Sequence, residues 1–457
     1  MTRVRKTMKI AQSSFFTLLS AALPAAVKQA EEAGDLKRAY GLIVRLLSKP
    51  LPAVLAGRLE YEKEKLRRIR KAYPYGREAA LKVLKDKLSD LKAGELKAWI
   101  NSGLITPKFI DGKERFFSDF SDNLLFLDAG LKKRLKKPNK ARAAVQRYKN
   151  RRLDELLRGA APAKYRIRAR ISLELRSPPR EKVRCWLPFP RVADQVSAAR
   201  LVAASHKNYR LSGAKAPQRT IYFEGKDRKF FAEFEYSISE CVLKPPRGRG
   251  HNSIPPAASR YLREEPPHIV FTPYVKKLAA QIVGREKDNY RKAGKIYDWL
   301  TRNLAYTFVL PYDLLENISE YGLQGRRGDC GVQVLAFITL CRAAGVPAKW
   351  QSGWNICPGR VNPHDWAMFY CGRWRYADIS VGASHRSEAR RGFYFGNLDA
   401  WRMPANSEFG ADLSPEKRHW RSDPVDNQVG EAETRSRNIY FDGFRRKLEL
   451  LSFKKIA

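Results

Sequence analysis

The sequence is poor in the residues and motifs that mark several common classes of protein. It has only six cysteines among 457 residues and no CxxC pair, which argues against a disulfide-stapled fold and predicts a reducing, cytoplasmic location. Its six histidines show no spacing with cysteine that would build a zinc site. Neither GxxxxGK[ST] nor GxGxxG occurs, so no phosphate-cradling loop is evident. The sequence therefore predicts no metal and no cofactor.

Long apolar runs are also missing. No stretch has enough consecutive apolar residues to span a bilayer, so we expect no transmembrane segment. Near the start, basic residues precede an apolar stretch, Phe15 to Val27, which has the look of a signal peptide. Serines and Pro24 interrupt this stretch, and it continues directly into a helical pattern from Lys28 to Ser48. We therefore interpret it as a helix of the mature protein.

Acidic residues are outnumbered: 47 Asp and Glu stand against 88 Lys and Arg, for a formal net charge of +41. The strongest run of basic residues, Lys132 to Arg152, contains no acidic residue. It predicts either a solvated helix or linker, or a contact with an acidic partner. Nucleic acid is the less favoured partner, because specific nucleic-acid modules interleave stacking aromatics and only Tyr148 occurs here.

The length and the 44% hydrophobic content predict two or three folded domains. Apolar residues recur at three- and four-residue steps up to about residue 90, with Gly34-Asp35 joining two helices and a third, charged helix at Leu59 to Ala72. The Asp111-Gly112 pair between apolar flanks predicts a hairpin. From Tyr165 to Leu175 the period changes to two, which indicates a half-buried strand and the first strand of a β-sandwich.

These patterns predict an α+β protein of five segments. We expect a helical N-terminal domain at 1–130, a basic linker or helix at 131–162, a β-sandwich at 163–245, a catalytic domain at 257–430 and a C-terminal tail at 431–457. The connector from Lys244 to Pro256 carries four prolines and marks the boundary before the catalytic domain.

The chemistry is predicted to begin at Cys330. The apolar run from Val334 to Leu340 indicates a buried helix that stops at Gly345-Val346-Pro347, and Cys330 falls in or beside its first turn. A helix N-terminus stabilises a thiolate and offers unpaired N–H groups to a developing oxyanion. Taken alone, a cysteine in this position is more often a small core residue than a nucleophile.

Two predicted strands supply the partners that a nucleophilic cysteine needs. The stretches His364 to Tyr370 and Trp374 to Ile379 are separated by a connection of hairpin length. Counting back from that turn places His364 near Asp378 on the adjacent strand, where a carboxylate can orient an imidazole. A thiol, an imidazole and an orienting acid are the parts of an amide-attacking enzyme, with Cys330 as nucleophile.

The residues from about 290 to 380 resemble the transglutaminase-like superfamily. The matching stretches are Gly328-Asp329-Cys330, Leu340 to Ala348, His364-Asp365-Trp366, and Gly372-Arg373-Trp374 with Asp378. The resemblance implies a papain-like core, in which a cysteine-bearing helix packs on an antiparallel sheet, and it implies that Cys330 is the nucleophile, His364 the acid–base and Asp378 the orienting residue. It differs from vertebrate-type crosslinkers in one respect: Gly331 stands where they carry an aromatic residue, which weakens the case for protein crosslinking.

Two functions of different classes follow. The first is a hydrolase or acyltransferase that acts on peptide or glutamine-type amides through a thioester on Cys330. The second is a catalytically silent transglutaminase-like scaffold whose basic N-terminal half binds a polyanion or a protein. Three side chains are candidates for completing an oxyanion hole or contacting substrate, on position alone: Gln324, Arg327 and Trp366.

Overall fold

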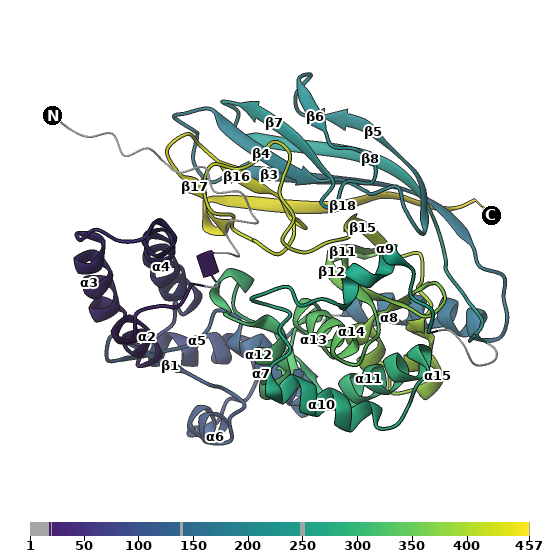
Figure 1. Cartoon of the computed structure of the whole chain (residues 1–457), viewed down its shortest axis with the longest axis horizontal. Helices are drawn as coiled ribbons and strands as arrows, with labels where there is room; N and C mark the ends of the chain where they lie inside the picture. The colour runs from purple at the N-terminus through teal and green to yellow at the C-terminus, as the bar shows by residue number, and fades with distance from the viewer. Residues whose placement is uncertain (1–17, 20, 138–139, 247–251, 457) are drawn as a thin grey trace.

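The computed structural model describes residues 18–19, 21–137, 140–246 and 252–456. Figure 1 shows three parts: N-terminal helices at the lower left, a sheet with packed helices at the lower right, and a two-sheet sandwich above them. Residues 15–17 and 20 of the predicted helix Phe15 to Val27 lie outside the described residues. The prediction of a continuous helix is wrong in the described part, because residues 21–24 are not helical and Pro24 precedes the helix that begins at Ala25. Within the described residues, no helix combines the length and the apolar content that crossing a membrane requires.

The N-terminal part consists of short helices around a hairpin. Gly34-Asp35 joins two helices, as the sequence predicts, and Asp35 caps the second by accepting a hydrogen bond from the Arg38 N–H. The predicted hairpin is present, and its turn residues Asp111 and Gly112 have φ values of 49° and 77°, the left-handed values that such a turn requires. The elements are α2 (Ala25–Glu32), α3 (Leu36–Leu47), α4 (Ala53–Ala72), α5 (Arg77–Lys87), α6 (Glu95–Asn101), β1 (Lys108–Ile110), β2 (Lys113–Arg115) and α7 (Phe120–Leu127).

The basic run forms η1 (Ala129–Arg134) and α8 (Lys140–Leu157), and α8 is packed against the rest of the chain. Arg152 forms a salt bridge with the buried Glu240 at 2.6 Å. Near the other end of the run, Arg134 contacts Asp90 at 2.6 Å and Glu95 at 2.7 Å. Several charges of the run are therefore neutralised inside the fold.

The sandwich consists of two antiparallel sheets with an apolar core between them. In β3 the alternate residues from Tyr165 to Leu175 are buried, as the period of two predicts. One sheet has the strand order β18-β3-β8-β5 and the other β17-β16-β4-β7-β6. The strands before the connector are β3 (Lys164–Leu175), β4 (Val183–Pro188), β5 (Val196–Ala204), β6 (Tyr209–Leu211), β7 (Thr220–Gly225) and β8 (Lys229–Ser239).

The segment expected to be a C-terminal tail belongs to this sandwich, which corrects that expectation. The long strand β18 (Phe444–Lys455) pairs antiparallel with β3 along nearly its whole length. The short strands β16 (Glu431–Glu433) and β17 (Asn438–Ile439) extend the other sheet, and η4 (Phe441–Gly443) precedes β18. The chain therefore returns to its first sheet after completing the second domain, and Figure 1 shows this yellow strand beside the blue β3. The other domain boundaries remain predictions.

The remaining part has a five-stranded sheet with the order β14-β13-β12-β11-β15. The Cys330 helix, α13, packs on β11 and β12 through a large apolar core, so the predicted α+β fold with a cysteine-bearing helix on an antiparallel sheet is confirmed. The strands are β9 (Ala305–Tyr306), β10 (Arg327–Gly328), β11 (Ala348–Cys357), β12 (Arg360–Tyr370), β13 (Trp374–Ala377), β14 (Phe395–Gly396) and β15 (Arg402–Asn406). The helices are α9 (Pro256–Ser259), η2 (Arg260–Leu262), α10 (Pro273–Val283), α11 (Asn289–Asn303), η3 (Tyr312–Leu314), α12 (Ile318–Gly325), α13 (Cys330–Ala343), α14 (Ile379–Ala383) and α15 (Glu388–Phe393).

Candidate active site

Cys330 is the first residue of α13, as the sequence predicts. The helix is capped by Asp329, whose Oδ1 accepts a hydrogen bond from the Val332 N–H at 3.1 Å. Residues from Gly331 to Arg342 are buried, whereas Cys330 itself is partly exposed. The apolar body of the helix therefore anchors it in the core, and Cys330 stands at its less deeply buried N-terminus.

Tyr312 explains why a glycine follows the cysteine. Its hydroxyl donates a hydrogen bond to Asp329 Oδ1 at 2.7 Å. A Cβ atom added to Gly331 would lie 2.0 Å from the same hydroxyl oxygen and 2.7 Å from the ring carbon that bears it. The side chain of Tyr312 thus occupies the space that any larger residue at position 331 would need.

His364 and Asp378 lie together, with the imidazole Nε2 2.8 Å from Asp378 Oδ2. Arg402 from β15 donates to the same carboxylate oxygen from its Nε, also at 2.8 Å. Burial alone would raise the pKa of Asp378, but the charges of His364 and Arg402 hold it well below its usual range. Burial lowers the pKa of His364, and Asp378 opposes that effect. Asp378 is therefore an ionised acid that orients the imidazole.

The thiol of Cys330 contacts a different residue of the same strand. Its sulfur donates to Asp365 Oδ2 at 3.1 Å, and Gln428 Nε2 donates to the other carboxylate oxygen at 2.5 Å. The same Gln428 amide donates to the main-chain oxygen of His364 at 3.0 Å. Burial, together with the charges of Asp365 and Asp329, raises the pKa of the Cys330 thiol well above its usual value. The thiol is therefore protonated at neutral pH in this arrangement.

Several aspartates share this region with the thiol. Burial raises the pKa of Asp329 to about 6, against hydrogen bonds from Tyr312 and three main-chain N–H groups that lower it. Burial also raises the pKa of Asp426 to about 6. The pKa values of Asp365 and Asp423 are raised well above their usual range, first by burial and then by the charge of Asp426. This concentration of acids disfavours a negative sulfur.

The structure brings together His364 and Asp378, but it does not join Cys330 to His364 by a hydrogen bond within the described residues. The thiol instead donates to Asp365 of the same strand. Nucleophile and imidazole nevertheless come from neighbouring positions, because the residue that holds the sulfur directly follows His364.

The three remaining candidates occupy different surroundings. Gln324 is exposed on α12 and its Nε2 donates to Glu320 at 3.0 Å. Arg327 lies in β10, where its backbone pairs with Ala305 of β9. Trp366 is buried, its indole N–H donates to Gln351 at 2.7 Å, and its ring lies 6.2 Å from that of His364. Trp366 therefore supports the imidazole from its own strand.

Sequence reasoning missed Asp365, Arg402, Tyr312 and Gln428. Asp365 could have been proposed from the sequence, because it directly follows His364 in the stretch that resembles the transglutaminase-like superfamily. The others come from segments with no motif, and only the packing of the chain brings them to the site. Within the described residues, no group of three or more His, Cys, Asp or Glu side chains is arranged to hold a metal ion, and all six cysteines are free.

Comparison with known proteins supports the class of this core. Residues 276–379, which include Cys330, His364 and Asp378, match the model of the transglutaminase-like superfamily. The comparison with curated proteins gives no match. A provisionally assigned cysteine protease from Cytophaga hutchinsonii is similar at 14% identity and a TM-score of 0.42, over 64% of this chain and 92% of its own. The periplasmic domain of TgpA from Pseudomonas aeruginosa is similar at 13% identity and a TM-score of 0.28, over 52% of this chain and 94% of its own.

The resemblance stated from the sequence is thereby confirmed. The chain carries a transglutaminase-like core, and the family match covers the helix that holds Cys330 and the strand that holds His364. It also covers Asp378, which lies just after β13 and caps α14 by accepting from the Val381 N–H, not within a strand as predicted.

Proposed function

We propose that the protein is a cysteine-dependent amide hydrolase or acyltransferase with Cys330 as nucleophile. His364 takes the thiol proton, and the sulfur attacks the carbonyl carbon of a peptide or glutamine-type amide. When the tetrahedral intermediate collapses, the C–N bond breaks and His364 returns the proton to the leaving amine. A thioester on Cys330 remains, and water or a second amine resolves it. Asp378 fixes the tautomer and orientation of the imidazole throughout.

The observation that carries the proposal is the hydrogen bond between His364 Nε2 and Asp378, together with the position of Cys330. Because Nε2 is hydrogen-bonded to the carboxylate, Nδ1 is the ring nitrogen that can exchange a proton with a thiol. Cys330 offers that thiol from a helix N-terminus, where the positive end of the helix dipole favours a developing negative charge. The site thus combines a nucleophile, an oriented base and a helix N-terminus.

The proposal requires the thiol to leave Asp365 and meet the imidazole when substrate binds. Catalytic hydrogen bonds are often loose in a free enzyme and tighten in the complex. In the free arrangement the acid-rich surroundings keep the sulfur protonated, so the resting site is weakly nucleophilic. A bound acyl group that displaces the Asp365 contact would activate it.

The test is labelling with a thiol-directed amide mimic, read by intact mass and peptide mapping. The wild-type protein should be labelled once, at Cys330, and Cys330→Ala should abolish the label. Cys341→Ala is the matched control, because Cys341 is on the same helix but fully buried. His364→Ala should reduce the rate of labelling by the mimic without removing the thiol. Equal labelling of the two cysteine variants would refute the proposal.

A peptide or protein is the proposed substrate, and a cytoplasmic location is kept as part of the proposal. The choice between hydrolysis and amine transfer is set by which acceptor reaches the thioester. Mass analysis of the product with and without an added primary amine distinguishes the two, because only transfer retains the amine.

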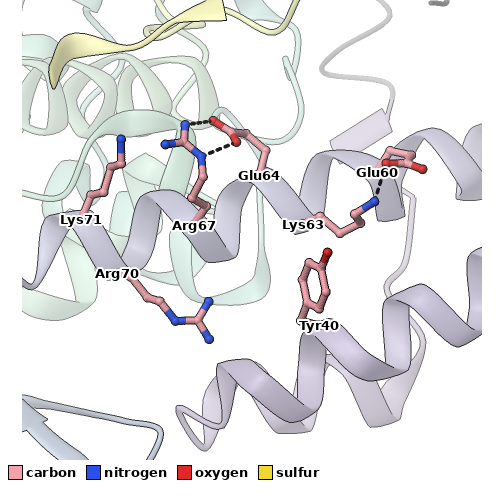
Figure 2. Close-up of a pocket in the computed structure, with 7 residues that line it drawn as sticks. All are labelled: Tyr40, Glu60, Lys63, Glu64, Arg67, Arg70 and Lys71. Carbon is pink, nitrogen blue, oxygen red and sulfur yellow. Dashed lines mark hydrogen bonds and ion pairs between the residues drawn. The ribbon is translucent and has the colours of Figure 1, made fainter. Parts of the chain in front are cut away.

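The second candidate is a silent scaffold with a basic binding surface. It is favoured by one observation, the protonated thiol on Asp365. The basic surface itself gives it less support, because cations that Figure 2 shows in the pocket between α3 and α4 already contact acids: Lys63 with Glu60, and Arg67 with Glu64. Arg70 and Lys71 of the same pocket pair with Asp111 and Asp442.

Filter binding to a polyanion at increasing salt tests this alternative. A scaffold that binds nucleic acid should lose affinity steeply with ionic strength. No binding at low salt would remove it.

A further inference from the structure

Three aromatic side chains form a cluster beside the N-terminus of α13, and none of them is part of the hydrophobic cores of the described residues. The ring of Phe126 from α7 lies 5.1 Å from that of Tyr306 and 5.5 Å from that of Phe308, both in edge-to-face geometry. The rings of Tyr306 and Phe308 lie 6.1 Å apart, so the three close into a triangle. Phe308 is 39% exposed although its ring contacts the two others.

The cluster is tied to the nucleophile by the backbone. Tyr306 pairs with Gly328, two residues before Cys330, in the short parallel ladder of β9 and β10. The Thr307 N–H donates to the Gly328 oxygen at 3.2 Å, which continues the contact. Burial, and then the nearby charges of Cys330 and Asp329, raise the pKa of Tyr306 well above its usual value. The tyrosine hydroxyl therefore lies in the electrostatic neighbourhood of the thiol.

The N-terminal helices hold the cluster in place. Asn123 of α7 bonds to both backbone groups of Phe308: its Nδ2 donates to the Phe308 oxygen at 2.9 Å, and its Oδ1 accepts from the Phe308 N–H at 2.7 Å. A side chain that satisfies both groups of one residue fixes the backbone there as a strand neighbour would. Phe308 is thus presented on a fixed backbone while its ring remains partly exposed.

We propose that Phe126, Tyr306 and Phe308 form a subsite for a large apolar side chain of the substrate that flanks the amide attacked by Cys330. The inference rests on the proposed function, and it names the substrate class for that site. Exposed aromatic rings that are rigidly held are costly in water and favourable when a ligand covers them. Because α7 supplies Phe126 and Asn123, the helical N-terminal part would contribute directly to substrate selection.

Two probes with the same thiol-reactive acyloxymethyl ketone test the subsite. One carries phenylalanine and the other alanine next to the reactive carbonyl. We expect the second-order rate of Cys330 labelling in the wild type to favour the phenylalanine probe by about tenfold, as expected for one apolar side chain in a pocket. Phe308→Ala should reduce this preference to about twofold or less, because it slows labelling by the phenylalanine probe.

Tyr209→Ala is the matched control, because Tyr209 is an exposed aromatic residue on β6 of the sandwich, and it should keep the full preference. Phe126→Ala should act as Phe308→Ala does, and its thermal unfolding is measured beside it, because Phe126 is partly buried. If Phe126→Ala unfolds, Phe308→Ala still decides the result.

Equal rates for the two probes in the wild type, or an unchanged preference in Phe308→Ala, would overturn the subsite and leave the proposed function intact. An absence of any label at Cys330 would instead refute the proposed function.

Discussion

His364 and Asp365 are consecutive residues of β12, yet they lie in opposite electrostatic surroundings. On the His364 side, Asp378 and Arg402 form a buried network of paired charges, and the carboxylate is ionised. On the Asp365 side, the acid contacts a thiol and a glutamine amide, and its pKa is raised. Consecutive residues of one strand therefore belong to two networks: one keeps an acid charged, and the other keeps acids and a thiol protonated.

The difference shows how one fold can orient a base while it keeps the nucleophile protonated. An arginine with no exposed surface gives Asp378 a permanent positive partner, whereas no comparable cation is among the residues that contact Cys330 or Asp365 in the described structure. The imidazole is oriented before substrate arrives, and the thiol is not yet activated. Three substitutions probe the two sides separately.

The largest effect is expected from Asp378→Ala on the paired side. Removing the carboxylate leaves Arg402 and His364 buried without their shared partner, so the free energy of unfolding should fall by about 3–5 kcal/mol at pH 7. The pKa of Asp378 is lowered in the folded protein, so its contribution is present above the ordinary aspartate pKa and is lost as the pH falls toward the lowered value. The difference between variant and wild type in urea should therefore shrink at acid pH.

Asp378→Asn is the control for this change, because an amide oxygen can still accept a hydrogen bond and cap α14. It should retain part of the stability while still impairing activity. A loss of stability in Asp378→Ala below about 1 kcal/mol would contradict the buried network.

A smaller effect is expected from Gly331→Ala on the thiol side. The added methyl group meets the Tyr312 hydroxyl, and overpacking of this kind should lower the free energy of unfolding by about 1–3 kcal/mol. Tyr312→Ala in the same chain should relieve the clash, so the double variant should be more stable than the sum of the two single effects predicts. Thermal or urea unfolding of all three variants measures this coupling, and strictly additive effects would show that Tyr312 does not fill the space.

The smallest effect is expected from Asp365→Asn, and this substitution tests the difference between the surroundings of His364 and Asp365 most directly. The amide can still accept from Gln428 and can donate to the sulfur, which favours the thiolate. The pKa of Cys330 is raised in the wild type, so chloroacetamide alkylation should be slow at neutral pH and rise above the ordinary thiol pKa. In Asp365→Asn the pH profile should shift downward, with alkylation at pH 7 faster by about tenfold, which corresponds to about one pKa unit.

Asp227→Asn is the matched control, because Asp227 is an exposed aspartate that contacts His206 in the sandwich, and its profile should match the wild type. A profile of Asp365→Asn that coincides with the wild type would show that Asp365 does not restrain the thiol.

Local sequence patterns were enough to predict much of the fold. The period of two from Tyr165 to Leu175, the turn at Asp111-Gly112 and the start of α13 at Cys330 all appear where they were expected. The contact of His364 with Asp378 also followed from local counting, because only a hairpin separates them. The prediction of a C-terminal tail was wrong because β18 pairs with β3, a strand nearly 300 residues earlier, and no local sequence pattern indicates such a distant partner.

The sequence by itself thus determined which residue types stand at a helix start, on a strand and directly after the next strand, because helix and strand periods are properties of short segments. Only the tertiary structure decided that Arg402 neutralises Asp378, that Tyr312 excludes a side chain at Gly331, and that the thiol rests on Asp365. These contacts join segments far apart in the chain, and their geometry depends on how helices and sheets pack rather than on the preference of any one segment.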